Sequence, residues 1–174
     1  MDLGNLGNLA DVIAIPIAVF GVILIVHQLR LTRLESEKEH QRRQNEMTLN
    51  AYNTVRGDLR DSIRQVRKKL ELEDMFDTFT NDHLEQVMRD KELRYDVARM
   101  LGFLNKFAVG IKYDVFNMML INDLAGKLFI QTYKQFRPYI NRVRKDSHTF
   151  YVDYEELVLK LEILRDDNFD NQGY

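Results

Sequence analysis

The stretch LGNLGNLADVIAIPIAVFGVILIVHQLRLTR, residues 3–33, sets the architecture that the sequence predicts. Residues 12–26 within it carry neither a charge nor a hydrogen-bonding side chain, and nine of these fifteen residues are Val or Ile. A helix of that length rises about 22 Å, and flanking leucines extend it towards the roughly 30 Å of a hydrocarbon core. The stretch therefore predicts a transmembrane helix over residues 12–29.

Two other interpretations of this segment fit the sequence less well. Its β-branched residues would suit a buried strand, but strands average about five to six residues and no other segment offers a pairing partner. A signal peptide needs a basic leader and a small-residue cleavage site, whereas the leader here contains Asp2 and Asp11 and no Lys or Arg.

The charges around the segment predict its orientation. Arg30, Arg33 and Lys38 follow it closely, and no basic residue precedes it. By the positive-inside rule, residues 1–11 form a translocated polar N-terminus and the rest lies in the cytoplasm. The expected location is the bacterial inner membrane, with the lipid bilayer as a partner.

Polar side chains occur at both ends of the predicted span. The leader repeats LGN, LGN and LAD, which indicates either a frayed terminus or a polar ring at the mouth of an oligomeric channel. The candidate membrane or pore residues are Asn5, Asn8, Asp11, Pro16, Phe20, Ile23, His27, Gln28 and Arg30.

Residues 30–46 predict a polar helical stalk that continues the span. Residues 35–46 include no apolar residue, and Glu39 precedes Arg42 and Arg43 at helical spacing. A helix that is polar on all sides is usually solvated or held by exposed ion pairs.

Residues 47–165 predict a cytoplasmic bundle of four or five main helices, and residues 166–174 a flexible acidic tail. Apolar residues recur every three or four positions, as in an amphipathic helix. Asp82 and Glu85 are expected to cap the second helix, a short helix is expected over residues 115–120, and the next helix is expected to begin at Asp123 and bend at Pro138. The predicted fold class is all-α.

Composition limits the chemistry that this chain can perform. The 174 residues carry a net charge of −2 and include no cysteine, which excludes disulfides and thiol catalysis. No phosphate-binding loop or zinc-protease motif is present, and the four histidines lack metal-ligand spacing. We expect neither a cofactor nor a metal.

Two clusters of basic residues remain as candidate sites. Arg142 and His148 end a predicted helix and could steady a phosphate and move a proton in RNA cleavage, or simply form a solvated helix end. The second cluster, Arg56, Arg60, Arg64 and Arg67, falls on one face of a helix. This face could contact lipid headgroups, RNA phosphate or an acidic neighbouring subunit, although Asp58 and Asp61 reduce its net positive charge. The alternative is an ordinary solvated helix face.

The layout of the chain resembles that of small single-span bacterial membrane proteins. An N-terminal span and the stretch QLRLTRLESEKEHQRRQ come first, and most of the likeness lies in two later segments, LNKFAVGIKYDVF and FRPYINRVR. More narrowly, the layout is similar to the membrane accessory proteins encoded beside type VI-B CRISPR RNA-targeting effectors. The resemblance implies a HEPN-like helical fold, a ring-like homo-oligomer and functional coupling to the RNA-guided effector in antiphage defence. It maps the HEPN-type motif onto Arg142 and His148, where Val143 replaces the usual polar residue.

Three functions stay open on the sequence. The first is an oligomeric pore that depolarises the infected cell, since one span per chain cannot enclose a channel. The second is a membrane-tethered ribonuclease that uses Arg142 and His148 and contacts RNA directly. The third is a non-catalytic membrane scaffold that recruits the effector. The sequence shows few residues arranged for catalysis, and this favours the pore.

Overall fold

The structure is a computed structural model that describes residues 3–74 and 76–170, with side chains for residues 20, 22–74 and 76–166. Five helices and no strand occur in this part of the chain, which confirms the all-α prediction. The chain divides into two compact units, Met1–Arg43 and Gln44–Tyr174.

Helix α1 (Leu3–Lys69) is continuous in the structure and spans 67 residues. It includes the apolar stretch, the polar stretch and the first helix expected for the bundle. In the part of the chain that the structure describes, no helix has a window of 18 residues apolar enough to cross a membrane. Half of the predicted span, residues 12–19 and 21, falls outside that search, because these side chains lie outside the described residues.

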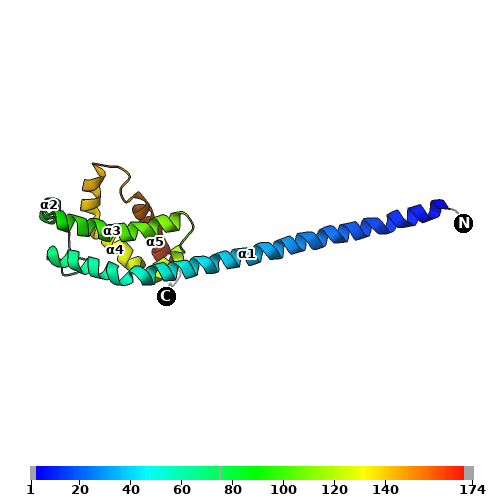
Figure 1. Ribbon diagram of the computed structural model, residues 1–174, viewed down its shortest axis with the longest axis horizontal. Coiled ribbons are helices and arrows are strands. Elements are labelled where there is room, and N and C mark those ends of the chain that lie inside the picture. Colours follow the sequence, from blue (N-terminus) through cyan, green and yellow to red (C-terminus); the bar gives the residue numbers. More distant parts are fainter. Residues whose placement is uncertain (1–2, 75, 171–174) are drawn as a thin grey trace. The chain divides into compact units, whose positions relative to one another are not determined.

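The second unit contains residues 44–69 of α1 together with α2 (Asn81–Arg89), α3 (Lys91–Lys112), α4 (Met118–Arg144) and α5 (Val152–Asp170) (Figure 1). Its contacts fix the helix directions. Residues 44–69 of α1 run antiparallel to α3, since Tyr52 packs on Phe107 and Lys69 pairs with Asp96. Helix α4 runs parallel to the same part of α1, because hydrogen bonds join Thr48 to Asn117 and Arg67 to Gln135.

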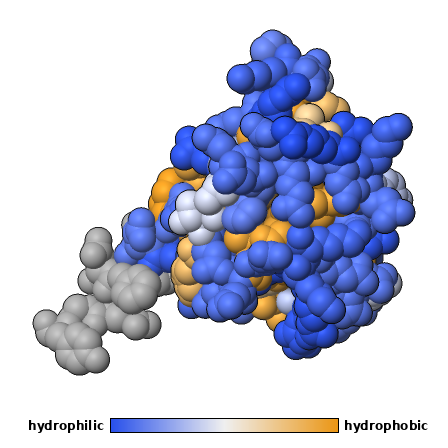
Figure 2. Space-filling model, turned by 90° about the vertical axis from the view of Figure 1, so that its left-hand side faces the viewer, coloured by the Kyte–Doolittle hydropathy of each residue, from blue (hydrophilic) through white to orange (hydrophobic). Residues whose placement is uncertain are grey.

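The core of this unit forms where the predicted apolar stripes meet. Edge-to-face aromatic contacts cross it from Tyr52 through Phe107 and Phe129 to Tyr154, so one chain of rings links α1, α3, α4 and α5. The fully buried side chains include Leu59, Leu93, Leu101, Leu104, Phe136, Ile140 and Leu161. They belong to the apolar residues of 47–165 that recur every three or four positions, and their burial supplies the main driving force for folding. The face in Figure 2, which looks onto the end of the molecule near α2, is mainly hydrophilic with small apolar patches.

Helix α2 begins at a different capping residue from the one that the sequence predicts. Thr80, rather than Asp82, is the N-cap of α2: its hydroxyl accepts from the His83 backbone, and the His83 ring accepts from the Thr80 N–H. The predicted partner Glu85 instead pairs with Arg89. The expected cap was wrong because histidine takes the position that Glu usually fills in this motif.

The expected short helix over residues 115–120 and the expected start at Asp123 were also wrong. The backbone N–H groups of Val115 and Phe116 bond to the Gly110 carbonyl in a turn, and the Asn117 side chain then caps α4. From Met118, α4 continues through Pro138 to Arg144. Helix α5 likewise continues to Asp170, so residues 166–170 of the predicted tail are helical.

Candidate functional sites

The apolar segment of α1 presents its large side chains without protein cover. We define it as Phe20, Val22, Ile23, Leu24, Ile25, Val26, Leu29, Leu31 and Leu34, whose exposed fractions lie between 44% and 61%. Soluble proteins rarely expose contiguous apolar surfaces beyond a few hundred Å². The segment is therefore a candidate surface for lipid or for another protein.

The candidate pore residues divide between described and undescribed positions. Phe20 and Ile23 belong to the apolar segment, and His27, Gln28 and Arg30 are exposed polar side chains that interrupt it. The other four candidates, Asn5, Asn8, Asp11 and Pro16, lie in the helix, but their side chains are outside the described residues. Beyond them, Glu39 and Arg43 form the ion pair that the spacing of the stalk predicts.

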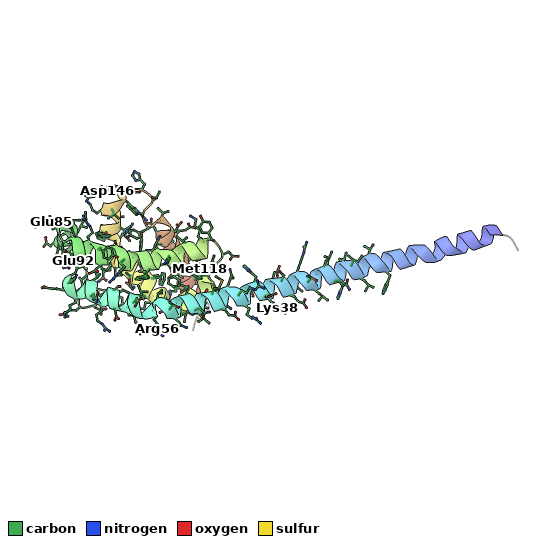
Figure 3. All side chains as sticks on the ribbon, viewed as in Figure 1. Lys38, Arg56, Glu85, Glu92, Met118 and Asp146 are labelled. Atoms are coloured by element: carbon green, nitrogen blue, oxygen red, sulfur yellow. The ribbon has the colours of Figure 1, made fainter. Side chains whose placement is uncertain are left out.

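Three of the four arginines of the predicted basic face line a cavity of about 510 Å³ in the second unit. We call it the basic cavity. Its lining residues are Arg60, Ile63, Arg64, Arg67, Lys68, Leu72, Glu73 and Leu128. Four of these side chains are cationic and one is anionic, and the remaining three form an apolar wall. Arg56, the fourth arginine of the face, does not line the cavity and lies on the exposed side of α1 (Figure 3).

Arg67 is the most deeply placed cation of the basic cavity. Its Nε donates a hydrogen bond to Gln135 Oε1 at 3.4 Å, and one terminal nitrogen is buried without a hydrogen-bond partner. Burial lowers the pKa of the Arg67 guanidinium from its ordinary value, while the negative charges of Asp74 and Asp77 act in the opposite direction. Arginine stays protonated despite such a shift, so a positive charge remains under-solvated at the cavity.

The loop between α1 and α2 closes one side of the basic cavity. Gln135 of α4 is buried and donates to the backbone carbonyls of Asp74 and Asp77 at 3.0 and 3.1 Å. The Asp77 carboxylate in turn accepts from the Asp74 backbone N–H at 2.8 Å. These hydrogen bonds hold in place the loop whose residues Leu72 and Glu73 line the basic cavity.

The acidic residues that lie between the arginines of the basic face in the sequence line a different cavity. Asp58 and Asp61 line a cavity of about 230 Å³ with Arg99 and Phe103. Asp61 does approach Arg64, but the nearest atoms are 3.9 Å apart and both side chains are well exposed, so this ion pair is weak. Asp58 and Asp61 therefore line a different cavity from the one that Arg60, Arg64 and Arg67 line.

The structure does not join the residues of the HEPN-type motif. The Arg142 guanidinium pairs with Asp146 at 3.2 Å, which offsets the charge that a phosphate would meet. His148 is exposed in the turn after α4, and no hydrogen bond between it and Arg142 occurs among the described residues.

Arg144, which the sequence analysis did not select, holds this turn in place. It donates to the backbone carbonyls of Phe150 and Tyr151 and pairs with Glu155 at 2.6 Å. Glu155 also accepts a hydrogen bond from Tyr133, and that bond, followed by the Arg144 contact, lowers the pKa of Glu155. Glu155 lies eleven positions from Arg144 and 22 from Tyr133, so helical spacing gives no sign of these contacts.

No group of three or more His, Cys, Asp or Glu side chains that could hold a metal ion occurs in the described part of the chain.

A family model described as a domain of unknown function, DUF4760, matches residues 13–161. The chain belongs to the DUF4760 family. The match includes most of the predicted span, the polar stretch of α1 and most of the helical unit, so the matched region extends over parts of both units. Comparison with curated proteins and with solved structures gave no match.

Proposed function

We propose that this DUF4760 protein is anchored in a membrane by the N-terminal part of α1, with its helical unit on the cytoplasmic side. The observation that carries the proposal is the exposure of the apolar segment: Phe20, Ile23 and Ile25 are 61%, 58% and 57% exposed. In water, such side chains are costly at about 25 cal/mol for each Å². A hydrocarbon environment removes that cost, and the basic residues that follow the predicted span, Arg30, Arg33 and Lys38, favour the cytoplasmic side for the helical unit.

We further propose that several copies assemble through this helix into a ring that perturbs the membrane. A single helix cannot enclose a pore, whereas a cyclic oligomer can. The apolar middle of the segment would close such a pore by dewetting, and polar positions at both ends suit its mouths. His27, Gln28 and Arg30 supply these positions on the cytoplasmic side, and the leader supplies them on the other.

The biological setting of this proposal rests on the sequence resemblance to accessory proteins of type VI-B CRISPR systems. In that setting, the ring opens during infection, depolarises the cell and strengthens the defence of the RNA-guided effector. The pairing of Arg142 with Asp146 gives no support to RNA cleavage as the mechanism.

The test uses a potential-sensitive dye in cells that carry the protein and the effector. We expect depolarisation on phage infection, and an unchanged potential during effective defence would contradict the pore. Replacing residues 12–29 with an unrelated membrane-spanning helix is the matched control. A pore requires that the exchange abolishes depolarisation, whereas full activity after the exchange would indicate a scaffold that needs only an anchor.

A further inference from the structure

The basic cavity is lined by four cations and one carboxylate, and the negative charges of Asp74 and Asp77 in the adjoining loop act on Arg67 as well. Arg60, Arg64 and Lys68 belong to α1 and reach the same hollow as Arg67. Of these four cations, Arg67 bonds to Gln135, and Arg64 has only the long contact with Asp61. Among the residues that the structure describes, no ion pair joins these cations to Glu73, the one carboxylate that lines the cavity.

The buried nitrogen of Arg67 is the sharpest sign that a ligand is missing. Leaving a buried donor unsatisfied costs about 1–3 kcal/mol, and more when the group is charged. The Nε atom is held by Gln135, which is itself held by the loop carbonyls. The guanidinium is therefore fixed in position while one of its nitrogens lacks an acceptor.

We propose that the basic cavity binds a small organic phosphate, with its phosphate oxygens on Arg64 and Arg67. Guanidinium groups match phosphate geometry through paired N–H donors, and cations in excess favour a ligand with more than one negative charge. At about 510 Å³, the cavity falls in the range of roughly 300–1,000 Å³ that is usual for small-molecule sites. Ile63, Leu72 and Leu128 provide an apolar wall for the uncharged part of the ligand.

The site is independent of the membrane proposal. Every residue that lines the cavity lies in the second unit, and none belongs to the apolar segment. The ligand could come from two sources with the same chemistry, namely a soluble metabolite such as a nucleotide or the headgroup of a phospholipid.

Calorimetric titration of the full-length protein in detergent tests the proposal with three soluble probes. The probes are ADP for a nucleotide, pyrophosphate for the charge alone, and glycerol 3-phosphate for a lipid headgroup. We expect saturable binding of at least one probe that weakens as salt is raised, because partly exposed charges are screened. Tighter binding of ADP than of glycerol 3-phosphate would indicate a soluble nucleotide, and the reverse order a lipid headgroup, while pyrophosphate measures the contribution of charge alone.

The chain offers a matched control for this titration. Arg64→Gln removes an exposed cation of the cavity and should weaken binding by roughly tenfold to a hundredfold, as expected for the loss of a hydrogen bond to a charged group. Arg56→Gln removes the same charge from the same helix outside the cavity and should leave affinity within about twofold, because only the screened long-range field changes. Arg67→Lys keeps the positive charge but loses the paired N–H donors of the guanidinium, so this variant should also bind the probes more weakly.

Two results would overturn the proposal. One is the absence of saturable binding by all three probes to the unaltered protein. The other is equal weakening by Arg56→Gln and Arg64→Gln, which would show attraction to the general charge of α1. Both substituted arginines are exposed, and circular dichroism of each variant verifies that the helices are intact.

Discussion

Buried tyrosines make the stability of the helical unit sensitive to alkaline pH. Burial, and then a hydrogen bond to Glu155, raises the pKa of Tyr133 to about 12. Burial also raises the pKa of Tyr151 to about 12 and that of Tyr154 well above its ordinary value. The unfolded chain releases these protons near pH 10. Stability from the neutral phenols is therefore complete below about pH 10 and is lost as pH rises towards 12.

Tyr151→Phe should reduce this loss of stability. The substitution removes a phenol that ionises only at high pH when folded, so denaturant unfolding between pH 9 and 11 should change less than in the parent protein. The difference should be about 1–2 kcal/mol, since Tyr151 is only partly buried. Tyr95→Phe, at an exposed side chain, is the control and should follow the parent. Identical pH profiles for all three proteins would contradict the assigned burial.

Two glycines of α3 make a matched pair of tests for packing. A Cβ on Gly110 would lie 2.2 Å from the Phe116 ring, whereas a Cβ on Gly102 would meet nothing within 4 Å. Gly110→Ala should therefore destabilise the protein by about 1–3 kcal/mol through overpacking. Gly102→Ala should stabilise it by about 0.5–1 kcal/mol, because alanine restricts the unfolded chain. Thermal or denaturant unfolding measures both, and the same sign of effect for the two variants would contradict the α3–α4 turn.

At this scale, the sequence predicts the partners within a helix better than those between helices. Glu39 and Arg43 pair as their spacing predicts. The Arg144 pair with Glu155 was missed because the chain first reverses through the turn at residues 145–151. Similarly, the periodicity of α1 places Arg60, Arg64 and Arg67 on one face, but it cannot show that Leu128 and the loop after α1 enclose a cavity against them.

Among the helices, the apolar stripes of α3, α4 and α5 were predictable because their period matches that of the helix. The helix ends were less predictable, since each depends on which polar side chain reaches an unpaired backbone group. Asn117 could have been recognised as a cap, as Asn is favoured at that position. His83 could not, because its role depends on the ring nitrogen accepting from Thr80.

The Thr80 cap is testable through the stability of α2. Thr80→Ala removes the hydroxyl that accepts from His83 and should cost about 1 kcal/mol, as for other N-caps. Amide hydrogen exchange should accelerate first in Asn81–Arg89. Thr78→Ala, in the same loop and exposed, should have little effect; an equal cost would mean that the loop, and not the cap, governs α2.

For the whole molecule, the two compact units differ in their surfaces. The second unit has its own core and carries the basic cavity, while the first presents apolar side chains that nothing in the described structure covers. The charge and hydropathy pattern predicts a membrane span, a polar stalk to residue 46 and a bundle from residue 47, and this assignment of roles stays a prediction. The sequence could not predict the number of copies in an assembly, because contacts between chains depend on surfaces that helical periodicity leaves undetermined.

Membrane extraction of the full-length protein tests the central claim most directly. After expression in bacteria and lysis, membranes are washed with alkaline carbonate and then treated with detergent. The account predicts that the protein stays in the membrane pellet through the wash and dissolves only in detergent. The double variant Ile23→Lys and Ile25→Lys should move to the soluble fraction, because each lysine in a hydrocarbon core costs about 2.5–3.5 kcal/mol. Release of the unaltered protein by carbonate, or its recovery in the soluble fraction before the wash, would contradict the account.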